Sequence, residues 1–105
     1  MSRKNAMAKF MVQVVLHDAP TAVEYDQLDR AMSNHGFLRE LAGRKGAYQL
    51  PVGTYWCKTS MDAADVRLMA TTAARASGGS FGILVVRSAA WCAIGLRPAA
   101  AGAEG

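Results

Sequence analysis

The stretch "KFMVQVVLHDAPTAVEY", residues 9–25, decides how this chain folds, because a strand, a turn and a helix start follow one another within it. Apolar side chains occupy every second position from Phe10 to Leu16, which is the period of a β-strand with one apolar face. The positions on the opposite face are mixed in character: Lys9, Met11, Gln13, Val15 and His17. Pro20 has no N–H to donate to a sheet, so we predict a strand over 9–17 that ends at the Asp-Ala-Pro turn.

A helix is predicted directly after this turn, over residues 22–35. Thr21 and Glu24 have the spacing of a capping box, in which each side chain bonds to the backbone N–H of the other residue. Four side chains recur at helical spacing and form the predicted buried stripe: Tyr25, Leu28, Met32 and His35. We interpret His35 as a half-buried histidine at the helix C-terminus, where Gly36 ends the helix.

The middle of the chain predicts two strands joined by a turn. The first covers 37–41, and the turn at 42–46 carries two glycines and two cations. The second strand is predicted over 48–58. Pro51 and Gly53 interrupt it, which indicates an edge position or a bulge.

A second helix and a last strand complete the pattern. The helix is predicted over 61–76 with Ser60 as its cap, and its many alanines suit close packing on a sheet. "FGILVVRS", residues 81–88, is the most apolar strand, so we predict that it lies at the centre of the sheet. A further edge strand is expected over 91–96.

The element order β-α-β-β-α-β predicts an α+β domain with the ferredoxin-like split βαβ fold. Right-handed crossovers then give an antiparallel sheet with both helices on one face. We place the single domain at 8–98, with flexible tails at 1–7 and 99–105. The other face of the sheet would leave Met11, Val15 and a Trp in contact with water, so we expect a homodimer.

Bulk composition excludes several protein classes. The net charge of +4 is compatible with nucleic-acid binding but is too small to indicate it. Cys57 and Cys92 lie far apart without metal-ligand spacing, which predicts reduced thiols in a cytoplasmic protein. The basic N-terminus lacks the apolar segment of a signal peptide, and no apolar run reaches the length of a membrane span. We therefore expect no membrane association.

His17 and Asp18 form the first candidate site, at the end of the first predicted strand. An Asp in this place can hold a divalent cation such as Mg²⁺, and a neighbouring His can act as a general acid or base. The alternative is structural, because Asp before Ala-Pro-Thr is a common turn residue that bonds to nearby backbone N–H groups.

Cations and aromatics in the middle of the chain form a second candidate site. Arg44 and Lys45 lie between two glycines, where they contact phosphates or simply complete a solvated hairpin turn. Tyr55 and Lys58 belong to "TYWCK", which suits base stacking beside a cation or, alternatively, core and interface packing. Cys57 in this stretch is interpreted as a small buried hydrophobic residue.

Several phrases of the sequence resemble the small GhoS-type proteins, the endoribonuclease antitoxins of type V toxin–antitoxin systems. The phrases are "MAKFMVQVVLHDA", "YDQLDRAMSNHGF" and "YQLPVGTYW", followed by the Ala-rich helix, and the resemblance covers residues 7–98. It implies a ferredoxin-like fold related to the small CRISPR-associated nucleases, and cleavage of single-stranded RNA such as a toxin mRNA. In those related nucleases an Asp that closes the first strand serves the metal, and Asp18 occupies the matching place.

Two functions from different classes follow. In the first, the protein is an RNA-binding and RNA-cleaving antitoxin: Asp18 binds metal or orients water, His17 assists proton transfer, and four cations hold phosphates. Those cations are Arg39, Arg44, Lys45 and Lys58. In the second, the protein is a non-enzymatic homodimeric interaction module, because the sequence contains no secure catalytic motif. A ligand-sensing domain of the same fold is a weaker third reading.

Overall fold

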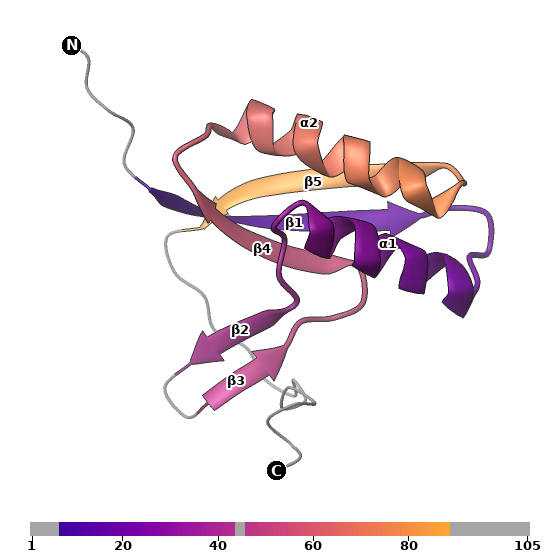
Figure 1. The fold of residues 1–105 in the computed structure, drawn as a ribbon, viewed down its shortest axis with the longest axis horizontal. Coiled ribbons are helices and arrows are strands. Elements are labelled where there is room, and N and C mark those ends of the chain that lie inside the picture. Colours follow the sequence, from indigo (N-terminus) through magenta and orange to yellow (C-terminus); the bar gives the residue numbers. More distant parts are fainter. Residues whose placement is uncertain (1–6, 44–45, 89–105) are drawn as a thin grey trace.

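Strand β1 (Ala8–Leu16) lies at the centre of a three-stranded antiparallel sheet in the computed structural model, which describes residues 7–43 and 46–88. Its neighbours are β4 (Thr54–Thr59) and β5 (Phe81–Ser88), so the strand order is β4-β1-β5. Figure 1 shows β1 between the two other strands, with β4 beside its first part, from Ala8 to Gln13, and β5 beside nearly all of it.

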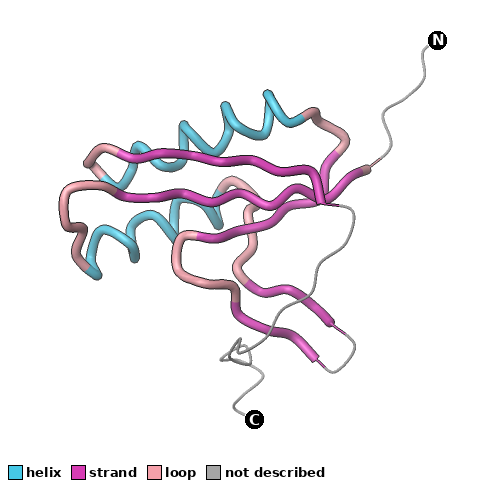
Figure 2. The backbone as a smooth tube through the Cα atoms, turned by 180° about the vertical axis from the view of Figure 1, so that it is seen from behind, coloured by secondary structure: helices cyan, strands magenta, loops and turns pink. Residues whose placement is uncertain are grey.

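Two helices cover one face of this sheet. They are α1 (Ala22–Asn34) and α2 (Ala63–Ala74), and a 3₁₀ turn, η1 (Arg75–Ser77), extends the second helix. In Figure 2, which views the domain from behind, the strands lie in front of both helices. The structure therefore confirms the predicted α+β class, and the arrangement is compatible with a ferredoxin-like split βαβ fold.

A ferredoxin-like sheet has four strands, but here a separate two-stranded hairpin takes the place of most of the fourth strand. It consists of β2 (Glu40–Gly43) and β3 (Gly46–Gln49) and projects away from the main sheet beside β4 (Figures 1 and 2). Before the hairpin begins, Leu38 forms one isolated antiparallel bridge to Trp56, with N–H···O distances of 2.8 and 2.9 Å.

The predicted continuous strand over 48–58 is wrong, because these residues belong to two strands in two different sheets. Pro51 cannot donate to a ladder, and Gly53 has a φ of +84°, in the left-handed region that glycine tolerates best. The Gly53 carbonyl then accepts a 2.7 Å bond from the N–H of Val14, which ties this turn to β1. The strand predicted over 37–41 likewise starts later, at Glu40.

The helix starts show one correct and one incorrect sequence prediction. The capping box of α1 is confirmed: the Glu24 N–H donates to Thr21 Oγ1 at 3.3 Å, and the Thr21 N–H donates to Glu24 Oε1 at 2.6 Å. Helix α2 is capped by Asp62 rather than Ser60, because the Asp62 carboxylate accepts the N–H of Asp65 at 2.9 Å. The positive end of the helix dipole also stabilises a carboxylate at this position.

The prediction that the strand over 81–88 is central is also wrong, because β5 lies at one edge of the described sheet. The strand is apolar on both faces, which is typical of a central strand. However, Leu84 and Val86 remain 58% and 48% exposed on the side without helices. The predicted strand at 91–96 lies outside the described residues, as do most of the predicted tails.

The core lies between the helices and the covered face of the sheet. Strand β1 contributes every second residue, and the helices contribute their apolar stripes; the buried set includes Phe10, Val12, Val14, Leu16, Leu28, Met32, Val66, Ala70 and Ala73. The prediction of a half-buried His35 is wrong: this residue is exposed at the C-cap of α1, and its Nδ1 lies 2.9 Å from the Ala31 carbonyl oxygen.

Within the described residues, neither helix has the length and apolar character needed to cross a membrane.

Candidate nucleic-acid interface on the open sheet face

The face of the sheet that the helices leave uncovered combines cations, one indole and several apolar side chains. Directly opposed residues of antiparallel strands point to the same face, so the register fixes which side chains share it. The open face comprises Lys9, Met11, Gln13, Val15, Thr54, Trp56, Lys58, Gly82, Leu84, Val86 and Ser88. This set contains two lysines and no acidic side chain, so the face is positively charged.

Three residues at one end of the open face form a basic-aromatic patch: Lys9, Trp56 and Lys58. Lys9 and Lys58 lie directly opposite each other across the β1–β4 ladder. Like charges in this position destabilise a sheet unless an anion lies between them. Lys9 Nζ is also 5.4 Å from the centroid of the Trp56 ring, within cation–π range. Within the described residues, the patch therefore places two cations without an acidic partner beside an aromatic surface.

The Trp56 ring is held in a defined orientation at the outer side of β4. Its Nε1–H donates a 2.5 Å hydrogen bond to the backbone carbonyl of Glu40, where strand β2 begins. Trp56 also pairs through its backbone with Leu38. A ring fixed in this way loses little conformational freedom when another flat group stacks on it, which favours binding.

The β5 side of the open face forms a second, apolar patch: Val15, Leu84 and Val86. Their side chains are 46%, 58% and 48% exposed. Met11 is half-buried and separates this patch from Trp56 in the same row of the sheet. Contiguous exposed apolar residues of this kind mark interaction surfaces.

His17 and Asp18 lie at the far end of β1 from the lysines, and both are exposed. Asp18 and Ala19 have positive φ values of 64° and 54°, a conformation that costs about 1–2 kcal/mol for residues other than glycine. The Asp18 carboxylate accepts a 3.0 Å bond from the Ser80 hydroxyl, and the Ser80 carbonyl accepts the His17 N–H at 3.0 Å. Asp18 therefore lies in a turn, as the structural alternative expected, but its carboxylate bonds to the distant Ser80 hydroxyl instead of the nearby backbone N–H groups that the alternative invoked.

The described residues around Asp18 do not supply a ligand set for magnesium. No group of three or more His, Cys, Asp or Glu side chains in the described part of the chain is arranged to hold a metal ion. Mg²⁺ requires near-octahedral oxygen coordination, usually with more than one protein or substrate ligand. The described residues of this turn therefore do not fit a magnesium site, and the catalytic and metal roles of Asp18 and His17 stay predictions.

Two of the predicted RNA-binding residues point away from the open face. Tyr55 is completely buried in the core, so it has no surface on which a base could stack. Arg39 is only 19% exposed and is engaged by Asp29 at 3.1 Å and by the Leu50 carbonyl at 2.6 Å. Lys58 does lie exposed on the open face, whereas Arg44 and Lys45 are outside the described residues.

The aromatic residue on the open face is Trp56, in agreement with the expectation that a Trp lies there beside Met11 and Val15, whereas the RNA-binding role was predicted for Tyr55. Alternation along β4 puts Tyr55 and Cys57 toward the helices and Trp56 toward the open face. The alternation therefore indicated the face of Trp56, but not the register that brings it beside Lys9. Burial raises the pKa of the Cys57 thiol, which agrees with its predicted role as a buried apolar residue.

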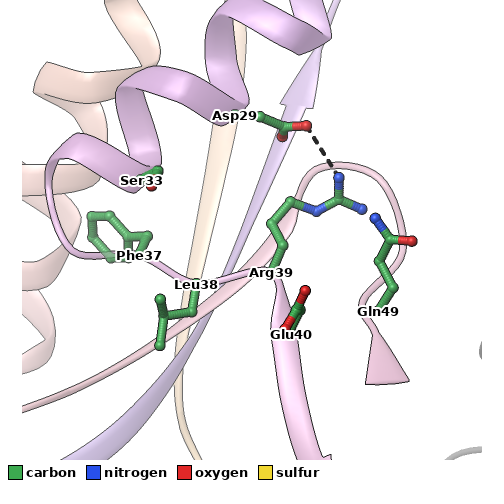
Figure 3. A pocket seen from close by; sticks show the side chains of 7 residues that line it. All are labelled: Asp29, Ser33, Phe37, Leu38, Arg39, Glu40 and Gln49. Atoms are coloured by element: carbon green, nitrogen blue, oxygen red, sulfur yellow. Dashed lines mark hydrogen bonds and ion pairs between the residues drawn. The ribbon is translucent and has the colours of Figure 1, made fainter. Parts of the chain in front are cut away.

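A partly buried polar network ties the hairpin side of the molecule to α1. Asp29 accepts hydrogen bonds from the Tyr55 hydroxyl and from Arg39 Nη1, and Figure 3 shows the second of these contacts. Burial raises the pKa of Tyr55 far above its ordinary range, and the bond and charge of Asp29 add to this effect. This network explains why Arg39 and Tyr55 are structural in this fold.

Comparison with known proteins adds no relative: no protein-family model, no curated protein and no solved structure matches the chain. The resemblance to the GhoS-type antitoxins therefore stays a prediction. A proposal for the function therefore depends on the residues and geometry of the open face.

Proposed function

We propose that this protein binds single-stranded RNA on the basic-aromatic patch of its open sheet face. The observation that carries the proposal is the direct opposition of Lys9 and Lys58 beside the Trp56 ring. A phosphate between the two ammonium groups removes their repulsion, and a base on the indole gains stacking energy. Single-stranded nucleic acids are commonly bound by this combination of cations and an aromatic platform on a sheet.

The proposal extends to the antitoxin-like activity that the resemblance implies. His17 lies at the opposite end of β1 from Lys9, about 27 Å away at 3.4 Å per strand residue. A strand of RNA that follows β1 from the basic-aromatic patch would thus reach the imidazole, which can accept the proton of a ribose 2′-hydroxyl. Asp18 would then hold the turn that carries His17 in place, because its carboxylate is bonded to the Ser80 hydroxyl.

A second candidate function, a homodimeric interaction module, is favoured by the apolar patch. Val15, Leu84 and Val86 lie on the β5 side of the face, away from Trp56 and Lys58 on β4. A second copy seated on this side would cover the exposed apolar surface and leave the basic-aromatic patch open. Analytical ultracentrifugation tests it: the wild type should sediment as a dimer, and Leu84→Lys should sediment as a monomer.

RNA binding is tested by fluorescence anisotropy with a labelled uridine decamer at low salt. Loss of one stacked base costs about 1–3 kcal/mol, so Trp56→Leu should weaken binding by about tenfold. Trp56→Phe, which keeps a stacking ring, should retain most of the affinity. Absence of wild-type binding, or equal binding by the two variants, would contradict the proposal.

Cleavage is tested separately on the same protein. Toxin-type transcripts are incubated with wild type, His17→Ala and Asp18→Asn, each with and without magnesium. The proposal expects cleavage by the wild type and its loss in His17→Ala. Binding without cleavage in every reaction would remove the catalytic part and leave an RNA-binding protein.

A further inference from the structure

A pocket of about 500 Å³ lies between α1 and the β2–β3 hairpin, next to the outer side of β4. Figure 3 shows Ser33 and Phe37 on the α1 side of this pocket and Glu40 and Gln49 on the hairpin side. Its volume falls within the range of small-molecule sites. The pocket lies outside the basic-aromatic patch, so the proposed function does not account for it.

The hairpin presents an acceptor and a donor to this pocket as one pair. Glu40 and Gln49 are register partners in the β2–β3 ladder, so their side chains leave the same face about 5 Å apart. The Glu40 carboxylate offers two acceptor oxygens, and the Gln49 amide offers two donor hydrogens. No described cation lies within ion-pair distance of Glu40.

The pocket wall behind this pair is rigid and partly apolar. Arg39 is fixed by Asp29 and by the Leu50 carbonyl, so its guanidinium is held in place beside the pocket. Leu38, which is exposed, supplies the accessible apolar lining, whereas the Phe37 side chain is buried and contributes almost no surface. A flat group can therefore rest against apolar atoms while its edge meets the two polar side chains.

The pocket is connected to the basic-aromatic patch through Trp56. The indole Nε1–H donates to the carbonyl of Glu40, and the Trp56 backbone pairs with Leu38. Both Glu40 and Leu38 line the pocket. An RNA strand that stacks on Trp56 and passes over the edge of β4 would arrive at this opening with its next base.

We propose that this pocket binds a guanine base. Guanine presents two adjacent donors, N1–H and N2–H, which match the two oxygens of the Glu40 carboxylate, and its O6 acceptor matches the Gln49 amide. Adenine and cytosine offer a single exocyclic amino donor, and uracil offers a single N3–H, so each leaves part of the pair unmatched. Polar groups left unpaired in a site cause strong discrimination.

The inference rests on the proposed function where the guanine belongs to a bound RNA strand, and it stands alone for a free guanine nucleotide. Binding of a uridine decamer is compared with binding of the same decamer carrying one central guanosine. The single guanosine should tighten binding by about tenfold. A parallel titration with GMP and UMP tests the free nucleotides, followed by the amide NMR signals of Glu40 and Gln49.

Glu40→Gln and Asp26→Asn provide matched variants, because both remove one exposed carboxylate and change the net charge equally. Glu40→Gln should bring the guanosine-to-uridine affinity ratio close to one, whereas Asp26→Asn should leave the ratio unchanged. A wild-type ratio near one, or an unchanged ratio in Glu40→Gln, would overturn the guanine site.

The two proposals fail in distinguishable ways. If the uridine decamer binds and guanosine adds nothing, the pocket proposal is wrong and the proposed function stands. If GMP shifts the Glu40 and Gln49 signals while no RNA binds, the pocket proposal stands and the proposed function is wrong.

Discussion

The two faces of strand β1 differ in what they do for the molecule. On the covered face, Val12 and Val14 are 0% and 2% exposed and belong to the core. On the open face, Val15 is 46% exposed, although it neighbours Val14 in sequence and is the same residue type. Burial explains the apolar residues of the first face but not those of the second. Folding of the single chain therefore does not account for the exposed apolar residues of the open face.

The largest expected effect concerns the turn that ties β4 to β1, at Gly53. A Cβ atom at Gly53 would lie 2.5 Å from the backbone oxygen of Val14, and the φ of +84° adds strain for any other residue. Gly53→Ala should lower the free energy of unfolding by about 3 kcal/mol, measured by urea denaturation.

Gly36→Ala is the matched control for this change. Gly36 has a similar φ of +87°, but a Cβ there would meet no atom within 4 Å. Its cost should stay near 1 kcal/mol, the cost of the left-handed conformation alone. Equal losses at the two glycines would show that the close approach of Gly53 to β1 does not exist.

A smaller effect separates the two faces directly. Val14→Ala should cost about 2 kcal/mol, because two buried methyl groups are lost and a cavity remains. Val15→Ala should change the free energy of unfolding by less than about 0.5 kcal/mol. Urea denaturation at low protein concentration, where a dimer contributes least, makes this comparison. A similar loss for both valines would contradict the assignment of covered and open faces.

Much of the fold was predictable because its signals are local. Period-two alternation in β1, the Thr21–Glu24 capping box and the order of the elements all depend on neighbours in sequence. The edge position of β5 was not predictable, because an apolar strand looks the same whether a neighbouring strand or a binding partner covers it. The projection of the β2–β3 hairpin was also missed, since Pro51 and Gly53 indicated an interruption but not its direction.

The candidate site was less predictable than the fold. The sequence pointed to Lys58, which does lie on the open face, but it also pointed to Tyr55, which is buried. The other two residues of the basic-aromatic patch, Lys9 and Trp56, lie close together only because β1 and β4 pair in one register. A register over more than 40 residues of chain is set by the tertiary fold and not by local spacing.

A third prediction concerns the hydrogen bond from Tyr55 to Asp29 beneath the sheet. Tyr55→Phe should cost about 1 kcal/mol, because the half-buried Asp29 carboxylate loses the hydroxyl donor but keeps the ion pair with Arg39. Burial first, and Asp29 second, raise the pKa of Tyr55 above the ordinary value of 10.0. The unfolded tyrosine thus ionises at a lower pH than the folded one.

This pKa difference fixes the sign of the pH dependence. The advantage of wild type over Tyr55→Phe should be constant below about pH 10 and should shrink as the pH rises above it. Urea denaturation of both proteins from pH 8 to pH 11 measures the difference. An advantage that grows above pH 10 would contradict the described Tyr55–Asp29 bond.

The central claim is that the open face binds single-stranded RNA through Lys9 and Lys58. Each phosphate contact contributes about 0.7 to the slope of log affinity against log salt concentration. The most direct measurement is this slope for wild type, for Lys9→Ala/Lys58→Ala, and for Arg67→Ala on the exposed side of α2. Because the two lysines share one phosphate, the account predicts that the double variant lowers the slope by about 0.7 while Arg67→Ala leaves it unchanged. An unchanged slope in the double variant, or an equal decrease in Arg67→Ala, would contradict it.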